Sequence, residues 1–69
     1  MNNKADLSEI EIKVIQLMSE ERTSKEIADS LCRGVRTVEG YRSVIREKVG
    51  AKNACGVLLY AIRNGIVKV

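Results

Sequence analysis

Residues 23–48 read TSKEIADSLCRGVRTVEGYRSVIREK, and this stretch decides the fold. It divides into a short segment with apolar residues at helical spacing, a turn CRGV, and a longer segment with the same spacing. Two helices joined by so short a turn are typical of a helix-turn-helix, whose second helix lies in the major groove of DNA. We expect the outer face of that second helix to carry Arg36, Glu39, Gly40, Ser43 and Arg46.

Capping signals on both sides of this stretch predict an all-α domain of four helices, at about 8–19, 24–31, 35–48 and 54–64. A Ser or Thr followed three residues later by Glu forms a capping box, in which each side chain binds the other residue's backbone N–H. Glycine favours the left-handed conformation in which helices end, and asparagine is a good N-cap. The signals are the boxes of Ser8 with Glu11 and of Thr23 with Glu26, the stops Gly50 and Gly65, and the N-cap Asn53.

Apolar residues at the helical period predict the buried side of each helix. Ile12 falls on the other side of the first stripe, so we expect it at the surface. Residues 1–6 are expected to form a disordered tail, followed by one domain over 7–69. The predicted core consists of Ile10, Val14, Ile15, Leu17, Met18, Ile27, Ala28, Leu31, Val38, Tyr41, Ile45, Val49, Val57, Leu58, Ala61 and Ile62.

Length and composition exclude several classes of protein. A chain of 69 residues buries only about 60% of its unfolded surface, which leaves little room for a deep enzyme pocket. The longest apolar run, residues 57–62, is too short to cross a membrane, and no apolar signal region begins the chain, so we expect a cytoplasmic protein. Cys32 and Cys55 lie far apart and the chain has no His, so we expect no metal, no cofactor, and reduced thiols packed as small hydrophobes.

Charge is distributed unevenly along the chain. Residues 1–21 carry 2 basic and 5 acidic side chains, whereas residues 22–52 carry 8 basic and 4 acidic ones. The net charge of these two segments is therefore −3 and +4, and the positive segment contains the predicted helix-turn-helix. Because neutralisation of phosphates supplies most of the non-specific affinity for DNA, this asymmetry favours a nucleic-acid partner.

Short motifs are spread over residues 7–67, and they are Leu7-Ser8, Lys25-Glu26-Ile27-Ala28, Thr37-Val38, Gly50, Asn53 and Asn64-Gly65-Ile66. Together they resemble the LuxR/NarL/GerE family of bacterial transcription factors. In that family, a four-helix domain binds double-stranded DNA as a homodimer, the third helix enters the major groove, and the fourth forms much of the dimer contact. The resemblance also implies an output domain of a response regulator in a two-component system, joined to an absent N-terminal receiver or sensor domain and acting with RNA polymerase.

The chain departs from the family pattern at three positions. Arg33 and Gly34 stand where an apolar residue and Ser are usual, and Tyr41 stands where His commonly follows the Thr-Val motif. Glycine is still an acceptable N-cap, so the helix should form. We expect the Arg33 side chain to extend outward, where it can reach water or a phosphate. The Tyr41 hydroxyl should lie at the edge of the core or touch a phosphate.

Residues on the second helix of the motif and around it divide into three candidate groups. For base contacts the candidates are Glu39, Gly40, Ser43 and Arg42. For phosphate contacts they are Lys25, Arg36, Thr37, Arg46, Lys48, Lys52 and Arg33. For a dimer interface they are Cys55, Leu59 and Arg63.

Some of these residues allow other interpretations of their role. Glu39 could instead pair with Arg42 or Ser43 on the helix surface, and Arg42 and Arg46 could read a guanine or hold the backbone. Gly40 weakens a helix, so it is explained by a close approach of the backbone to DNA or by room for a base methyl group.

The sequence also bears on three classes of function other than DNA binding. A helix-turn-helix can serve purely as a protein interaction module, which apolar residues at Ile12 and Leu59 would favour. RNA binding fits poorly, because the chain has few aromatic residues for stacking on bases. An enzyme fits least, because no nucleophile has a plausible base.

Overall fold

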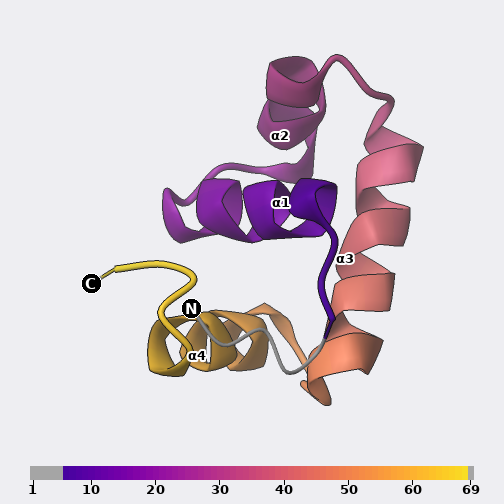
Figure 1. Ribbon diagram of the computed structural model, residues 1–69. Coiled ribbons are helices and arrows are strands. Elements are labelled where there is room, and N and C mark those ends of the chain that lie inside the picture. Colours follow the sequence, from indigo (N-terminus) through magenta and orange to yellow (C-terminus); the bar gives the residue numbers. More distant parts are fainter. Residues whose placement is uncertain (1–5, 69) are drawn as a thin grey trace.

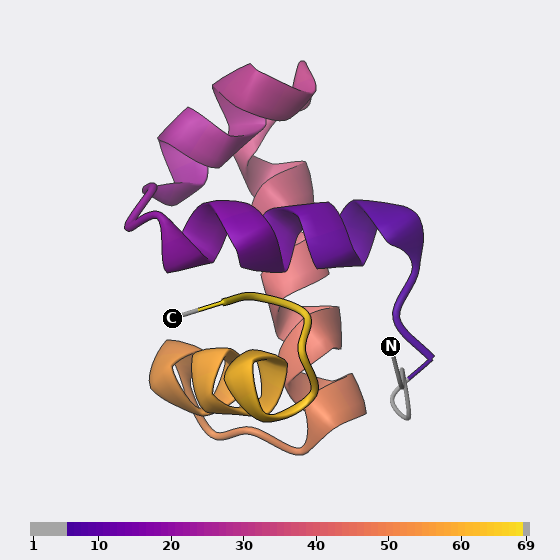
Figure 2. The ribbon, with the colours of Figure 1, turned by 60° about the vertical axis from the view of Figure 1, so that its left-hand side comes forward.

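The computed structural model describes residues 6–68, which form four helices and, within that range, no strand. The helices are α1 (Glu9–Ser19), α2 (Ser24–Leu31), α3 (Val35–Val49) and α4 (Ala54–Arg63). In Figure 1, α3 stands along one side of a stack formed by the other three helices and packs against each of them. Figure 2 shows α1 crossing α3, with α4 below α1. The predicted all-α, four-helix fold is confirmed, and all of the predicted tail except Asp6 lies outside the described residues.

The helix starts form as the sequence predicts. The Ser8 hydroxyl accepts the N–H of Glu11 at 3.3 Å, and Glu11 Oε1 accepts the N–H of Ser8 at 2.9 Å. The same reciprocal bonds join Thr23 and Glu26, at 3.2 and 2.8 Å. Asn53 caps α4 by accepting a backbone N–H at 3.0 Å. Because each bond spans only three residues, these caps fix the helix starts locally.

All four helices end in the same turn, a Schellman motif. In each, the backbone N–H groups of two successive residues beyond the helix bond back to carbonyls three and five residues earlier. The first of these two residues has a left-handed backbone: Glu21 (φ 63°), Cys32 (φ 55°), Gly50 (φ 71°) and Gly65 (φ 72°). The two glycines match the predicted stops, whereas Glu21 and Cys32 adopt a conformation that costs an L-residue about 1–2 kcal/mol.

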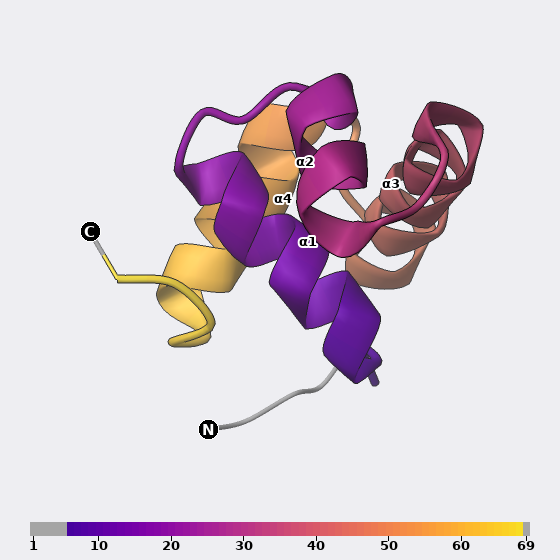
Figure 3. The same cartoon turned by 90° about the horizontal axis from the view of Figure 1, so that it is seen from above.

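The turn of the helix-turn-helix follows directly from the end of α2. The N–H of Arg33 bonds to the carbonyl of Ala28 at 2.9 Å, which reverses the chain. Gly34 then takes an extended backbone as the N-cap of α3, without a side chain to cap it. Seen from above in Figure 3, the turn leads from the end of α2 across to the start of α3 beside it. The predicted pair of closely joined helices is therefore present.

Most of the predicted core is buried, but Ile62 is not. Its side chain is 42% exposed on the outer side of α4. Ile66 and Val67, which the helical pattern did not include, are buried instead. The turn at Gly65 sends this C-terminal segment back between α1 and α4 (Figure 2), so Ile66 and Val67 rather than Ile62 complete the buried core there.

The first turn of α1 also differs from the prediction, although Val14, Ile15, Leu17 and Met18 are buried as expected. Glu11 is buried, Ile12 is half-buried and packs against the core, and Ile10 is half-buried outside the core cluster. The placement of Ile12 at the surface and of Ile10 in the core was therefore wrong. The reason is that Glu11, paired with Lys48 of α3, occupies the buried position between Ile10 and Ile12.

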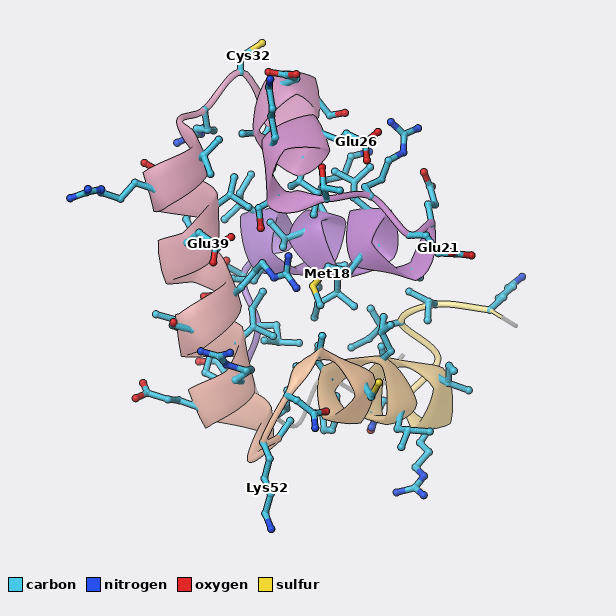
Figure 4. The ribbon with its side chains drawn as sticks, turned by 180° about the vertical axis from the view of Figure 1, so that it is seen from behind. Met18, Glu21, Glu26, Cys32, Glu39 and Lys52 are labelled. Carbon is cyan, nitrogen blue, oxygen red and sulfur yellow. The ribbon has the colours of Figure 1, made fainter. Side chains whose placement is uncertain are left out.

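Both cysteines are free and exposed, so the expectation that they pack as small hydrophobes was wrong. Figure 4 shows Cys32 at the outer end of the turn after α2. Across residues 6–68, no three His, Cys, Asp or Glu side chains gather as a metal site would require. None of the helices in this range is long and apolar enough to cross a membrane.

Cys32→Gly is expected to raise the free energy of unfolding by roughly 0.5–1 kcal/mol, because glycine takes the left-handed backbone without a steric cost. Cys55→Gly is the matched control. This thiol is also exposed but lies inside α4, so its replacement should lower stability by roughly 0.3 kcal/mol, the difference between the helix propensities of cysteine and glycine. Urea denaturation of both variants shows whether each change raises or lowers the free energy of unfolding. A loss of stability in both would show that the left-handed backbone at Cys32 is not strained.

Candidate nucleic-acid interface

The outer side of α3 is an exposed surface on the edge of the fold. Arg36, Glu39, Gly40 and Ser43 are all exposed there, as the helical spacing predicts. The inward side of the same helix holds Val38 and Ile45, which are fully buried. Because α3 packs against all three other helices through that inward side, its outer side is held as a rigid, protruding ridge (Figure 1).

The structure adds two residues to this face that the sequence analysis missed. Glu47 is exposed four residues after Ser43, and Val44 is 41% exposed four residues after Gly40. Residues four apart are neighbours on a helix surface, so the helical period was the signal that could have found them. The outer face thus carries carboxylates at Glu39 and Glu47, with Arg36 at its N-terminal end.

Glu39 forms neither of the two alternative helix-surface pairs, with Arg42 or with Ser43. Arg42 donates instead to the Ser24 hydroxyl at 2.8 Å, and Ser43 accepts a hydrogen bond from Arg46 at 3.2 Å. Arg42 is half-buried and reaches back to the first residue of α2, so it ties the two helices of the motif together. Arg46 stays exposed beside Ser43, which leaves its guanidinium at the edge of the outer face.

Arg33 extends into solvent from the turn, as expected for a charged residue at that position. Its guanidinium donates to the Tyr41 hydroxyl at 3.2 Å. The Tyr41 ring is half-buried and packs against the core, so the hydroxyl lies at the edge of the core. The bond holds the Arg33 side chain along α3.

The phosphate candidates near the two helix starts are exposed. Lys25 is the second residue of α2, and Arg36 and Thr37 are the second and third residues of α3. Backbone N–H groups of a first helical turn, together with the helix dipole, favour an anion there. Lys52 lies far from them, in the turn between α3 and α4, and points away from the body of the domain (Figure 4).

Lys48 is exposed, but its ammonium is engaged by α1 and the segment before it. Its ammonium donates to Glu11 Oε1 at 2.9 Å and to the carbonyl of Asp6 at 3.4 Å. Burial by itself would raise the pKa of the Glu11 carboxyl, but the bonds from Lys48 and Ser8 and the charge of Lys48 outweigh it, so the pKa lies below its ordinary value. The pair joins α1 to the C-terminal part of α3.

Glu11→Gln is expected to lower the free energy of unfolding by roughly 1–2 kcal/mol near neutral pH, because it removes the charge that Lys48 faces. The folded-state pKa of Glu11 is lowered, so this stabilisation is complete above the unfolded value of about 4.3 and is lost as the pH falls through the folded pKa. Urea denaturation across this pH range should show the two proteins converging at low pH. Glu9→Gln, an exposed change in the same first turn, should show only about 0.3 kcal/mol at any pH. A gap between Glu11→Gln and the parent that persists in acid would contradict the charge-based explanation.

The three predicted dimer residues lie together on α4. Cys55, Leu59 and Arg63 line one open hollow of about 470 Å³, which also includes Lys52 and Tyr60. Leu59 is 52% exposed. The exposed Ile62 follows Leu59 by three residues, so it extends the apolar part of this surface along the helix.

Two comparisons with known proteins bear on this arrangement. The family model for bacterial regulatory proteins of the luxR family matches residues 5–61, which include the whole helix-turn-helix. A comparison with curated proteins finds no match. The family match covers most of the chain and spans α1, α2, α3 and most of α4. The chain therefore belongs to the luxR family of bacterial regulatory proteins, whose helix-turn-helix domains are DNA-binding regulators of transcription.

Proposed function

We propose that this domain binds double-stranded DNA in a sequence-dependent manner, with the outer face of α3 in the major groove. The observation that supports this most strongly is the free, protruding face of α3, on which polar side chains stand over a fully buried inner side. Glu39 would accept a hydrogen bond from a cytosine amine, and Ser43 would donate or accept one. Arg42, tied to Ser24, would contact DNA only if it left that bond.

Phosphates on either side of the groove would be held by the exposed cations around α3. Lys25, Arg36 and Thr37 would bind through the first turns of α2 and α3, where backbone N–H groups add to the attraction. Arg33 and Arg46 would extend this contact along α3. Lys48 would contribute mainly through the ion pair that positions α3, and Lys52 would reach the backbone only at the far end of the helix.

A second copy would bind through α4. Its apolar surface, Cys55, Leu59 and Ile62, is exposed and can pair with itself across a twofold axis. The hollow around it is lined by Lys52 and Arg63 and by no acidic residue. Two copies therefore bring four cations together, so association should be weak until DNA holds both copies on half-sites about one helical turn apart.

The remaining parts of this proposal come from the family. They are attachment to a receiver or sensor domain, as in a response regulator of a cytoplasmic two-component system, and contact with RNA polymerase at the promoter. The alternative of a pure protein interaction module is weakened by Ile12, which packs against the core and is not a free surface residue. The α4 surface remains the place where such a module would bind.

Titration against a random-sequence duplex pool, with recovery of the bound duplexes, tests the proposal. We expect an enriched motif and an affinity that falls as salt rises, since each phosphate contact releases counterions. Salt-sensitive binding without an enriched motif would contradict the base contacts and leave the phosphate contacts standing. No binding at any salt concentration would overturn the proposal and bring the interaction module forward.

Ile62→Glu is expected to weaken binding to a duplex with two half-sites by roughly 10- to 100-fold, because the linked second contact is lost. Binding to a duplex with a single half-site should not change, which makes that duplex the control. Mild oxidation of the DNA-bound Cys32→Ser protein should trap a covalent dimer through Cys55 on a non-reducing gel. Equal losses on both duplexes, or only monomer on the gel, would contradict an α4 interface.

A further inference from the structure

Gly40 is a glycine that the fold does not require. It lies in the middle of α3, where its backbone is helical, and the left-handed glycines of the described chain are Gly50 and Gly65. A Cβ built at Gly40 would meet nothing within 4 Å outside its own helix turn. Glycine inside a helix nevertheless costs about 1 kcal/mol relative to alanine. No contact within the described domain explains this cost.

Val44 is the other unusual residue on the same face. It is 41% exposed one helical turn after Gly40, on a surface otherwise made of Arg36, Glu39, Ser43 and Glu47. Valine is a poor helix former, and here its methyl groups gain little from burial in the protein. By its helical spacing, Val44 thus stands one turn from the open position at Gly40, and we call this gap the notch.

Thr37 completes the notch on the other side. It is exposed and lies three residues before Gly40, so Thr37 and Val44 stand one turn to either side of the gap. Helix neighbours of this kind have Cβ atoms about 5–6 Å apart, which leaves a space of roughly the size of a methyl group where the Gly40 side chain is missing.

We propose that the notch of Thr37, Gly40 and Val44 binds the C5-methyl group of a pyrimidine, an inference that rests on the proposed entry of α3 into the major groove. In the major groove, thymine is the base that presents such a group to an apolar side chain. A 5-methylcytosine presents the same methyl group at the same place, so both bases share the chemistry that the notch recognises. The carboxylate of Glu39 would then accept from an amine on a neighbouring base, which gives α3 one apolar and one polar reading position.

The test uses the duplex recovered from the random-sequence pool, with each thymine replaced singly by deoxyuridine. This change removes only the methyl group. We expect about a fourfold loss of affinity at one position in each half-site, the effect of a single buried methyl. In Val44→Ala the same replacement should have no effect, and in Gly40→Ala the preference for thymine should disappear while the free domain becomes more stable. Placing 5-methylcytosine at that position should restore the affinity relative to cytosine.

Val35→Ala is the matched control, because Val35 is also an exposed valine of α3 but lies outside the notch. It should keep the full response to deoxyuridine. A duplex that binds equally well with every thymine replaced would overturn the inference and leave the proposed function intact. Recovery of a motif without thymine would overturn it in the same way. Failure to bind any duplex would instead overturn both.

Discussion

Ser43→Glu is expected to weaken the affinity for duplex DNA by roughly 100-fold or more without harming the fold. Ser43 is exposed at the centre of the α3 outer face, with Glu39 four residues before it and Glu47 four residues after it. A third carboxylate in this row would enter the major groove, between the phosphates of the two strands, and like charges brought together at an interface cost several kcal/mol. Glutamate is a better helix former than serine, so α3 should remain intact.

Gln16→Glu is the control for this change. Gln16 is exposed on α1 and gains the same single negative charge with almost no change of shape. If the position of the charge decides the effect, Gln16→Glu should bind nearly as the parent does, and circular dichroism should show both variants folded. Equal losses in the two variants would mean that only net charge matters, which would contradict the docking of α3.

Ile45→Ala is expected to lower the free energy of unfolding by about 2–5 kcal/mol, the range for large-to-small changes in a core. Ile45 is fully buried on the inward side of α3. It shares a small hollow of about 20 Å³ with Met18 of α1 and Val57 of α4, so its side chain lies where three helices meet. A domain of this size has a total stability of only about 3–10 kcal/mol, so the variant should be partly unfolded at moderate temperature.

The neighbouring change Val44→Ala is the stability control. Val44 is exposed on the same helix, and alanine is the better helix former, so stability should stay equal or rise slightly. Urea denaturation followed by circular dichroism measures both variants. A small effect of Ile45→Ala, below about 1 kcal/mol, would show that the three helices do not depend on one shared core.

The sequence by itself determined the features that depend on near neighbours in the chain. The capping boxes at Ser8 and Thr23, the cap at Asn53 and the stop at Gly50 were readable because each hydrogen bond closes within three to five residues. The helical period likewise determined that Glu39, Gly40 and Ser43 share a face. The short turn between two such helices was enough to predict the helix-turn-helix.

The tertiary structure decided what depends on residues far apart. Glu11 is buried and pairs with Lys48, 37 residues later, and its neighbour Ile12 packs against the core. Ile62 is exposed because Ile66 and Val67 return through the turn at Gly65 and bury themselves against α1 and α4. The helical period identifies the apolar side of one helix. Which of those apolar residues become buried depends on which segments of the chain occupy the same volume, and that is decided only when the helices pack together.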